Sequence, residues 1–354
     1  MTEGQKISES RDRLKSGEEQ KESQDRLKNG EEQKESRKRF WTEPAVVFLA
    51  ALICCFLWGS ASPAIKIGYV LFNVPRGDLA SRILFAGVRF TIAGLMVVVF
   101  DSIRRKKISV PQRQSWKYVL ALMSFQTILQ YVFFYTALAH TSGVRGSIIN
   151  AAGNFFSIIF SVFIFHYEKL TVRKTLGSLL GFLGVVLIST GGKISGMPFT
   201  LAGDGAMLLA TLSSAMAANL IKKFSAHEDP VVLSGWQFFL GGLVMAFGGF
   251  AAGGRITPAG PEAIILILYM GFISAGAYTL WSILLKYNEV SRIVILGFMN
   301  PVLGVLLSAA FLDERSEAFS LLTLISLILV SAGIVISAGK RRRADAAPEK
   351  AVKR

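Results

Sequence analysis

Cysteine, histidine and charged residues are scarce in this sequence, and each scarcity excludes a class of site. The chain has 2 cysteines, 3 histidines and 18% charged residues, whereas soluble domains usually carry about 25% charged residues. Cys54 and Cys55 are neighbours in one apolar run, so we expect buried thiols and no disulfide. No apolar run combines a histidine with an acidic residue, and no metal-ligand spacing occurs. We therefore expect no enzyme active site, no metal and no cofactor.

Acidic residues are missing from the middle of every apolar run. Outside the two polar tails the chain has twelve of them, and all lie in loops or at the ends of runs. Proton relays within membranes depend on ionisable side chains placed at membrane depth. The absence therefore favours facilitated diffusion or exchange over proton antiport. Asp204 would reverse this expectation if its helix began deeper in the membrane.

Apolar residues are abundant, since 52% of the chain is hydrophobic and the mean hydropathy is +0.47. Ten apolar runs have the length of a bilayer-spanning helix, about 17–25 residues. These runs cover 45–68, 80–100, 117–138, 144–165, 175–191, 203–221, 230–251, 263–285, 292–311 and 320–338. None alternates with a period of two residues, as a transmembrane barrel strand does. The sequence therefore predicts an all-α integral membrane protein with ten transmembrane helices.

The charge in loops and tails indicates how the chain is oriented. With the amino terminus inside, the inner loops carry thirteen Lys and Arg residues and the outer loops carry six. The positive-inside rule then places both termini in the cytoplasm, in a multi-pass protein of the cytoplasmic membrane. The net charge of +15 is explained by this topology and by attraction to anionic membrane lipid at 340–343. Nucleic acid is not expected as a partner.

Two polar tails flank the apolar part of the chain. Residues 1–40 contain a 13-residue unit, first at 9–21 and again at 22–34, with one leucine in each copy. One leucine per repeat cannot support a packed core. We expect 1–40 to be a disordered or transiently helical cytoplasmic tail, and 340–354 to be a basic cytoplasmic tail.

The two halves of the apolar part resemble each other. Residues of the first half recur in the same order in the second, at a nearly constant offset. The matched pairs are Arg89 and Gln237, Phe90 and Phe238, Gly94 and Gly242, Tyr131 and Tyr278, Asn154 and Asn300, Glu168 and Glu314, and Gly184 and Gly333. Each half has five runs, an odd number, so the second half enters the membrane in the opposite direction. The sequence predicts two inverted five-helix repeats, at 41–192 and 199–339.

Several short motifs resemble those of a known family. They are Trp58-Gly59, Ala64-Ile65-Lys66, Arg89-Phe90, Gly94-Leu95, Glu168, Asn300-Pro301 and Glu314. Over residues 41–340 the chain resembles the drug/metabolite transporter superfamily, in the branch with two EamA-type domains. The resemblance implies export or exchange of small metabolites, often amino acids or drug-like compounds, through a central cavity between the repeats.

Polar and aromatic side chains within the runs are candidates for a substrate pathway, because polar groups inside a membrane span are costly. The candidates are Trp58, Lys66, Arg89, Gln126, Gln130, Tyr131, Asn150, Asn154, Gln237, Tyr278, Trp281 and Asn300. Arg89 lies ~10 Å along its helix from the outer end, where it can attract a carboxylate or phosphate, or instead snorkel outward. Lys66 stands at a helix end and snorkels easily.

The fourth run carries a polar stripe with spacings of three and four residues, which places its members on one helix face. They are Ser147, Asn150, Asn154, Ser157 and Ser161. Small polar residues commonly join membrane helices, and the same face can also line a cavity. Amides need several partners, so Asn150, Asn154 and Asn300 are favoured as substrate contacts.

These patterns favour a secondary transporter that moves a small metabolite by alternating access. Two alternatives stay open. One is an exchanger of sugar nucleotides or other phosphorylated metabolites, which would need more than one deep cation, and the sequence places only Arg89 securely. The other is a membrane channel or scaffold. The sequence leaves the oligomeric state open.

Overall fold

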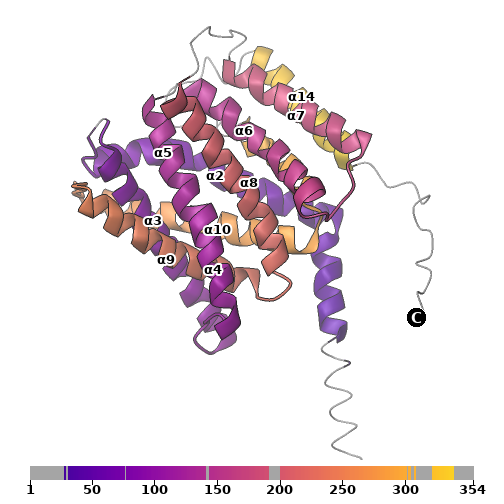
Figure 1. Ribbon diagram of the computed structural model, residues 1–354, viewed down its shortest axis with the longest axis horizontal. Coiled ribbons are helices and arrows are strands. Elements are labelled where there is room, and N and C mark those ends of the chain that lie inside the picture. Colours follow the sequence, from indigo (N-terminus) through magenta and orange to yellow (C-terminus); the bar gives the residue numbers. More distant parts are fainter. Residues whose placement is uncertain are drawn as a thin grey trace, which may run out of the picture. The chain divides into compact units, whose positions relative to one another are not determined.

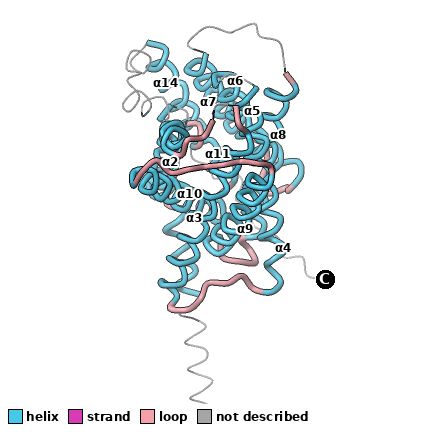
Figure 2. The backbone as a smooth tube through the Cα atoms, turned by 90° about the vertical axis from the view of Figure 1, so that its left-hand side faces the viewer, coloured by secondary structure: helices cyan, strands magenta, loops and turns pink. Residues whose placement is uncertain are grey.

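The computed structural model of the protein describes residues 28, 31–75, 77–140, 143–190, 200–300, 302–303, 307 and 321–338. Every regular element in this part of the chain is a helix, as Figure 2 shows. Within it, six helical segments are long and apolar enough to cross a membrane. They are Pro44–Leu71, Leu79–Arg105, Arg113–Ala137, Leu201–Phe224, Pro230–Ala251 and Pro261–Tyr287. The predicted all-α class is confirmed, whereas the number of ten spans and the inverted repeat stay predictions.

The chain divides into two compact units, Met1–Val47 and Phe48–Arg354. In the first unit, residues 31–42 are helical, and the side chains of 31–40 are exposed. Apart from these residues and residue 28, the predicted tail at 1–40 lies outside the described residues, as does 340–354. The helical bundle belongs to the second unit.

The helices follow the predicted runs closely, with π-helical stretches inserted in three of them (Figure 1). In chain order the elements are α2 (Pro44–Leu71), α3 (Leu79–Arg105), η1 (Arg113–Ser115), α4 (Trp116–Leu122), η2 (Met123–Leu129), α5 (Gln130–His140), α6 (Gly143–Ile159), η3 (Phe160–Ile164), α7 (Val172–Thr190), η4 (Leu201–Gly205), α8 (Ala206–Phe224), α9 (Pro230–Ala251), α10 (Pro261–Tyr287), α11 (Val290–Leu296) and α14 (Leu321–Ala338). The π-helices are η2, η3 and η4. Such stretches are frequent at functional sites.

Two aspartates begin the central helices α3 and α9. Asp78 accepts hydrogen bonds from the backbone nitrogen and the hydroxyl of Ser81, at 3.1 and 2.6 Å. Asp229 accepts one from the backbone nitrogen of Val231, at 2.9 Å. Pro230 follows Asp229 in the first turn, where a missing N–H is tolerated. Each carboxylate satisfies an amide that would otherwise lack a partner at the start of its helix.

α3 and α9 pack through glycines, which brings their backbones into contact. A Cβ atom added to Gly87 would lie 2.8 Å from the carbonyl oxygen of Gly242, and one added to Gly94 would lie 2.6 Å from that of Gly235. Small residues allow membrane helices to approach this closely. An offset of 148 carries Gly87 onto Gly235 and Gly94 onto Gly242. The contact of Gly87 with Gly242 therefore corresponds, under this offset, to the contact of Gly235 with Gly94.

α7 and α14 form a second pair with the same property. A Cβ atom on Gly184 would lie 2.9 Å from the carbonyl oxygen of Ser326, and one on Gly333 would lie 2.5 Å from that of Gly177. An offset of 149 carries Gly177 onto Ser326 and Gly184 onto Gly333. In Figures 1 and 2 this pair lies beside α6, away from α3 and α9.

The ninth predicted run, 292–311, is not one uninterrupted helix. α11 is short and ends in a turn at 297–298, before helical residues 299–300. The backbone nitrogens of Gly297 and Asn300 donate to carbonyl oxygens three residues earlier, at 3.0 Å each. In the sequence Pro301 follows Asn300, and a proline has no N–H to donate to the carbonyl four residues before it. Most of the rest of the run lies outside the described residues.

A buried carboxylate ties the end of α3 to the start of α9. Asp101 is 0% exposed and accepts hydrogen bonds from Arg104, Arg105 and the Ser109 hydroxyl, at 2.6, 2.6 and 2.5 Å. Arg105 also reaches the carboxylate of Asp229, the residue that caps α9, at 2.6 Å. The charge of Asp101 is thus compensated within the protein, unlike that of a free acidic group at membrane depth.

A second buried carboxylate, Glu168, connects the loop before α7 to the start of α11. It accepts hydrogen bonds from Ser161 Oγ and Lys174 Nζ, at 2.5 Å each, and from the backbone nitrogen of Ser291 at 3.1 Å. The hydroxyl of Ser291 donates to it as well. Burial by itself raises the pKa of Glu168, but the hydrogen bonds from Lys174, Ser161 and Ser291 and the charge of Lys174 bring that pKa below its ordinary value.

We expect Glu168→Gln to destabilise the protein near neutral pH by about 3 kcal/mol, as the loss of one charge from a buried pair does. A carboxylate with a lowered folded-state pKa stabilises the fold above its unfolded pKa, and this stabilisation is lost as the pH falls through the folded value. Thermal unfolding in detergent between about pH 7 and pH 3 should therefore show the wild type converging on the variant.

The control for this measurement is Glu289→Gln. Glu289 also pairs with Lys174, at 3.0 Å, but its side chain is 45% exposed. Its substitution should change the stability by less than about 1 kcal/mol. A gap between wild type and Glu168→Gln that stays constant from neutral to acid pH would contradict the assignment.

Candidate functional site

Tyr131 and Tyr278 meet inside a cluster of aromatic rings. Their hydroxyl oxygens are 2.5 Å apart and share a hydrogen bond between α5 and α10. Beside them Phe90 of α3 and Phe238 of α9 stack, with ring centroids 5.4 Å apart and planes 9° from parallel. Each of these residues therefore contacts its own counterpart in the other half of the sequence. Residues beside a two-fold axis are arranged in this way.

Arg89 projects into the same cluster and is 4% exposed. Its guanidinium carbon lies 4.4 Å from the centre of the Phe90 ring and 5.7 Å from that of the Tyr131 ring. Tyr135 belongs to the same hydrophobic cluster as Phe90, and Tyr69, Tyr131 and Tyr278 pack against that cluster. Among the described residues no acidic side chain pairs with it, and its Nε has no hydrogen-bond partner. Aromatic faces attract a cation but do not replace the hydrogen bonds that a guanidinium has in water.

Gln237 occupies the position in α9 that corresponds to Arg89, but its side chain is hydrogen-bonded at both ends. Its Nε2 donates to Gln126 Oε1 at 2.9 Å, and its Oε1 accepts from Thr127 Oγ1 at 2.7 Å. Gln126 and Thr127 belong to the π-helix η2. At the 147-residue offset the counterpart of Gln126 is Ile273, which offers no side-chain hydrogen bond. At the same offset the counterpart of Thr127 is Ser274, so a hydroxyl is present in both halves and the amide of Gln126 in one.

Trp58 extends the aromatic cluster from α2. Its ring centroid lies 5.1 Å from that of Tyr278 and 5.0 Å from that of Trp281, and both contacts are edge to face. Asn154 of α6 reaches the same region, because a Cβ atom on Gly297 would lie 3.5 Å from both Asn154 Oδ1 and Trp281 Cη2. The turn that interrupts the ninth run thus lies against the cluster.

Three predicted site residues are less buried than Arg89. Lys66 and Asn150 are exposed, and Asn300 is half-buried. Burial increases along the polar stripe of the fourth run, from Asn154, which is half-buried, to Ser157, which is buried. A helix face that meets its neighbours only along its later turns buries only the residues on those turns.

Five of the eleven buried side-chain polar atoms without a hydrogen-bond partner in the described chain lie around Arg89 and the Tyr131–Tyr278 pair. They are Trp58 Nε1, Tyr69 Oη, Arg89 Nε, Gln130 Oε1 and Tyr135 Oη. Tyr131 and Tyr278 are each half-buried. Buried polar groups in proteins are nearly always satisfied. This concentration of unmet donors and acceptors is typical of a site that binds a polar ligand or water.

Sequence reasoning missed Tyr69 and Tyr135, which pack in the cluster around Phe90. Both stand near the ends of apolar runs, where tyrosine usually marks the membrane interface. The spacing of the tyrosines could have identified Tyr135, because it follows Tyr131 by one helical turn and so lies on the same face of the helix. For Tyr69 no comparable signal exists, since its approach to Arg89 depends on how α2 packs against α3.

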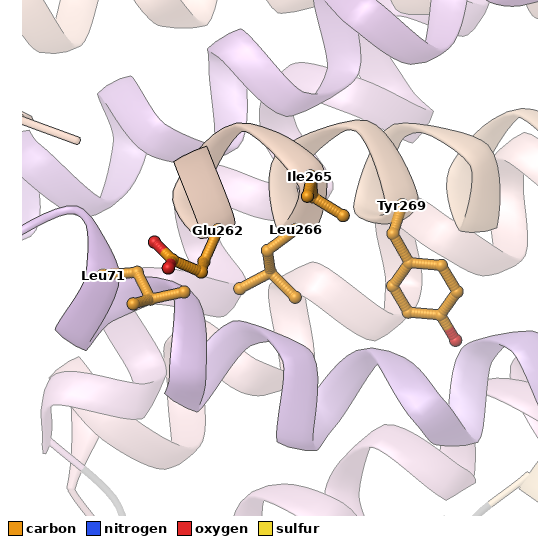
Figure 3. Close-up of a pocket in the computed structure, with 5 residues that line it drawn as sticks. All are labelled: Leu71, Glu262, Ile265, Leu266 and Tyr269. Atoms are coloured by element: carbon orange, nitrogen blue, oxygen red, sulfur yellow. The ribbon is translucent and has the colours of Figure 1, made fainter. Parts of the chain in front are cut away.

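A pocket of about 410 Å³ lies at a different place, between the end of α2 and the start of α10 (Figure 3). It is lined by Leu71, Glu262, Ile265, Leu266 and Tyr269. None of the predicted site residues lines this pocket. The hydroxyl of Tyr269 is 2.9 Å from Ser60 Oγ, so that polar group has a partner within the protein.

Acidic groups do not enter the aromatic cluster in the described chain. Asp204 lies in the first turn of the segment Leu201–Phe224, where its carboxylate accepts a hydrogen bond from the backbone nitrogen of Thr200 at 2.9 Å. It therefore stands at the end of its segment. No group of three or more metal-ligating side chains occurs among the described residues.

Comparison with known proteins agrees with this architecture. The EamA-like transporter family matches the chain twice, at residues 45–190 and 201–339. The chain belongs to the EamA-like transporter family. The resemblance carried by Trp58-Gly59 and Arg89-Phe90 is thereby confirmed, and the protein is a multi-pass membrane transporter with a small-molecule substrate.

Relatives of this EamA-like transporter cover nearly the same length. It is 26% identical to the uncharacterized transporter YvbV of Bacillus subtilis, over 84% of this chain and 94% of that protein. It is also 26% identical to a probable amino-acid metabolite efflux pump of Escherichia coli, over 81% of this chain and 93% of that protein. A solved structure described as "Crystal structure of protein" shares the fold, with a TM-score of 0.68 at 18% identity, over 83% of this chain and 96% of that one.

Proposed function

We propose that this EamA-like transporter is a secondary transporter that carries a small metabolite with an acidic group, an amino acid or a similar compound, by export or exchange. The observation that carries the proposal is Arg89, a buried cation without an acidic partner in the described chain. The printed function of the Escherichia coli relative, amino-acid metabolite efflux, is compatible with such a substrate.

The environment of Arg89 supports an acidic ligand rather than a structural role. A buried charge without a counter-charge costs several kcal/mol, and aromatic contacts offset only about 0.5–2 kcal/mol of that. A carboxylate beside Arg89 would accept two hydrogen bonds in a forked geometry. The hydroxyls of Tyr69 and Tyr135 and the indole N–H of Trp58 could donate further bonds to the same ligand.

The proposed transporter has ten spans arranged as two inverted repeats, at 41–192 and 199–339. Three kinds of contact support a two-fold relation between them. Tyr131 meets Tyr278, Phe90 stacks on Phe238, and the glycine contacts of α3 with α9 and of α7 with α14 exchange under the offset. The two family matches fall on the same two segments. With such symmetry one site can face either side of the membrane in turn.

The Lys and Arg distribution supports both termini in the cytoplasm. In that orientation the Asp101–Arg105–Asp229 and Glu168–Ser291 contacts lie on the cytoplasmic side. Both join the first half of the sequence to the second. Alternating access through the Arg89 cluster would have to break them each time the cytoplasmic side opens.

Counterflow in liposomes tests this function. The purified full-length protein is reconstituted, loaded with an unlabelled metabolite, and assayed for trans-stimulated uptake of amino acids, drug-like cations and phosphorylated metabolites. We expect saturable counterflow for at least one compound with an acidic group. Flux that rises linearly with concentration and shows no trans-stimulation would indicate a channel, and no flux of any compound would remove the transport proposal.

Substitution of Asn154 tests its place at the site. We expect Asn154→Ala to lower counterflow about ten-fold, the effect of one lost hydrogen bond with its partner left unmet, with unchanged amounts in the membrane. The control is Thr136→Val, which keeps the side-chain shape at a hydroxyl that donates to Val132 of the same helix. Normal counterflow in Asn154→Ala would remove this residue from the site.

A further inference from the structure

A second arginine lies on the same face of α3 as Arg89. Arg82 precedes Arg89 by seven residues, which is two helical turns, and stands in the first turn of α3. Its guanidinium is therefore ~10 Å nearer the end of the helix. In the proposed orientation that end faces the outside. A cation here precedes the buried one on the way from the outer surface.

Tyr69 lies between the two arginines. The guanidinium carbon of Arg82 is 5.4 Å from the centre of the Tyr69 ring, and Tyr69 packs against the cluster that contains Phe90, the ring over which Arg89 lies. The ring packs against Phe85, which stands between the arginines in the sequence, with centroids 5.7 Å apart. The Tyr69 hydroxyl and the Arg82 Nε are both buried without a hydrogen-bond partner in the described chain.

The acidic residue beside Arg82 is already engaged elsewhere. Asp78 interacts electrostatically with Arg82, but both of its oxygens accept hydrogen bonds from Ser81 as it caps α3. Among the described residues no ion pair forms between Asp78 and Arg82. The guanidinium of Arg82 therefore has N–H groups that can donate hydrogen bonds to an oxyanion from outside the protein.

Arg255 is an arginine whose guanidinium is hydrogen-bonded within the protein, and it serves as a comparison for Arg82. It follows α9 at the same end of the α3–α9 pair, where its backbone nitrogen donates to Ser81 Oγ at 2.8 Å. Its guanidinium donates to the carbonyl oxygens of Gly254 and Phe250, at 2.8 and 3.4 Å, and lies over the Phe250 ring at 4.8 Å. Arg82 has no such carbonyl partners in the described chain.

We propose that Arg82 forms an outer oxyanion subsite, at which the acidic group of a substrate binds before it passes Tyr69 and reaches Arg89. The ligand chemistry is a carboxylate or phosphate group, which a guanidinium binds through two parallel hydrogen bonds. The inference rests on the proposed function and adds a second binding position to it. It also supplies the second cation that a phosphorylated substrate would need.

Chemical protection tests the subsite directly. Full-length protein in phosphatidylcholine nanodiscs is treated with the arginine reagent phenylglyoxal, and the modification of each arginine is followed by peptide mass spectrometry. We expect benzoate or inorganic phosphate, at a concentration several times its Kd, to slow the modification of Arg82 about five-fold or more, because the occupied fraction of the site is protected. Arg255 in the same sample should change by less than about two-fold, as expected for a cation without a bound ligand.

The arms of this experiment separate the sources of the oxyanion. Protection by benzoate alone assigns carboxylate substrates, and protection by phosphate assigns phosphorylated ones. Protection that requires phosphatidylglycerol in the bilayer, with no effect of either soluble anion, would mean a lipid contact and would overturn the substrate subsite. Equal slowing at Arg82 and Arg255, or no slowing at either, would also overturn it.

Transport kinetics give a second, independent readout. With a substrate found by counterflow, Arg82→Gln should raise KM about ten-fold, the loss of one charge-assisted hydrogen bond, and leave the maximal rate within about two-fold. Arg255→Gln should change neither, because a solvent-exposed charge contributes about 0–1 kcal/mol. If the wild type transports and Arg82→Gln keeps its KM, the subsite is wrong and the transporter stands. If the wild type shows no counterflow, the proposed function itself fails.

Discussion

Replacing Arg89 by glutamine is expected to lower the uptake of an acidic substrate about 100-fold or more and, at the same time, to raise the thermal stability of the substrate-free protein. The loss of uptake follows from removing a forked, charge-assisted interaction worth up to about 3 kcal/mol. The gain in stability follows because a buried charge without a counter-charge is removed. Counterflow and thermal unfolding, measured on one preparation, check both.

The paired readout separates a binding role from a structural one. If Arg89 merely anchors carbonyls at a helix end, Arg89→Gln will be less stable than the wild type and will retain uptake. Arg89→Lys keeps the charge but loses the planar fork, so its uptake should fall between those of the wild type and the glutamine variant. Arg255→Gln serves as the matched control, since Arg255 bonds to the carbonyls of Gly254 and Phe250.

Gly94→Ala is expected to prevent the protein from accumulating in the membrane. A Cβ atom at this position would lie 2.1 Å from the backbone nitrogen of Phe239, so α3 and α9 would have to separate along their whole contact. Overpacking against side chains costs about 1–3 kcal/mol, and here the obstacle is main chain, which cannot change rotamer. A loss of about 3 kcal/mol or more is a large part of total stability. The yield of monodisperse protein and its unfolding temperature measure the effect.

Gly248→Ala is the matched control for this substitution. Gly248 lies in the same helix pair, in α9, and no atom lies within 4 Å of its added Cβ. Alanine favours a helix over glycine by about 1 kcal/mol, so this variant should be as stable as the wild type or slightly more stable. Normal yield of Gly94→Ala would show that the two helices are not as close as described.

Much of the fold followed from the sequence because lipid allows few alternatives. The length of the apolar runs predicted the positions of most helices. The sequence places Tyr131 and Tyr278, and Phe90 and Phe238, at a nearly constant offset, and in the structure the two members of each pair are in contact.

Other features depend on packing that no single segment reveals. The π-helix η2 contains one extra residue within an otherwise regular helical run. A hydropathy pattern does not reveal such an insertion. Tyr69 approaches Arg89 only through the way α2 lies on α3. The interruption after α11 was a missed local signal, because Gly297 and Pro301 stand four residues apart. The exposure of Asn150 could not be read from a stripe that gives a face but not the extent of its burial.

The contact between α3 and α9 also limits how this chain can diverge over generations. Elsewhere a larger residue in one helix can be accommodated by a smaller one opposite. At Gly87 and Gly94 the facing atoms include main chain, which no mutation of a single facing residue can make smaller. Substitutions are therefore tolerated more readily in the loops and on the outer surface than at the glycine contacts between α3 and α9.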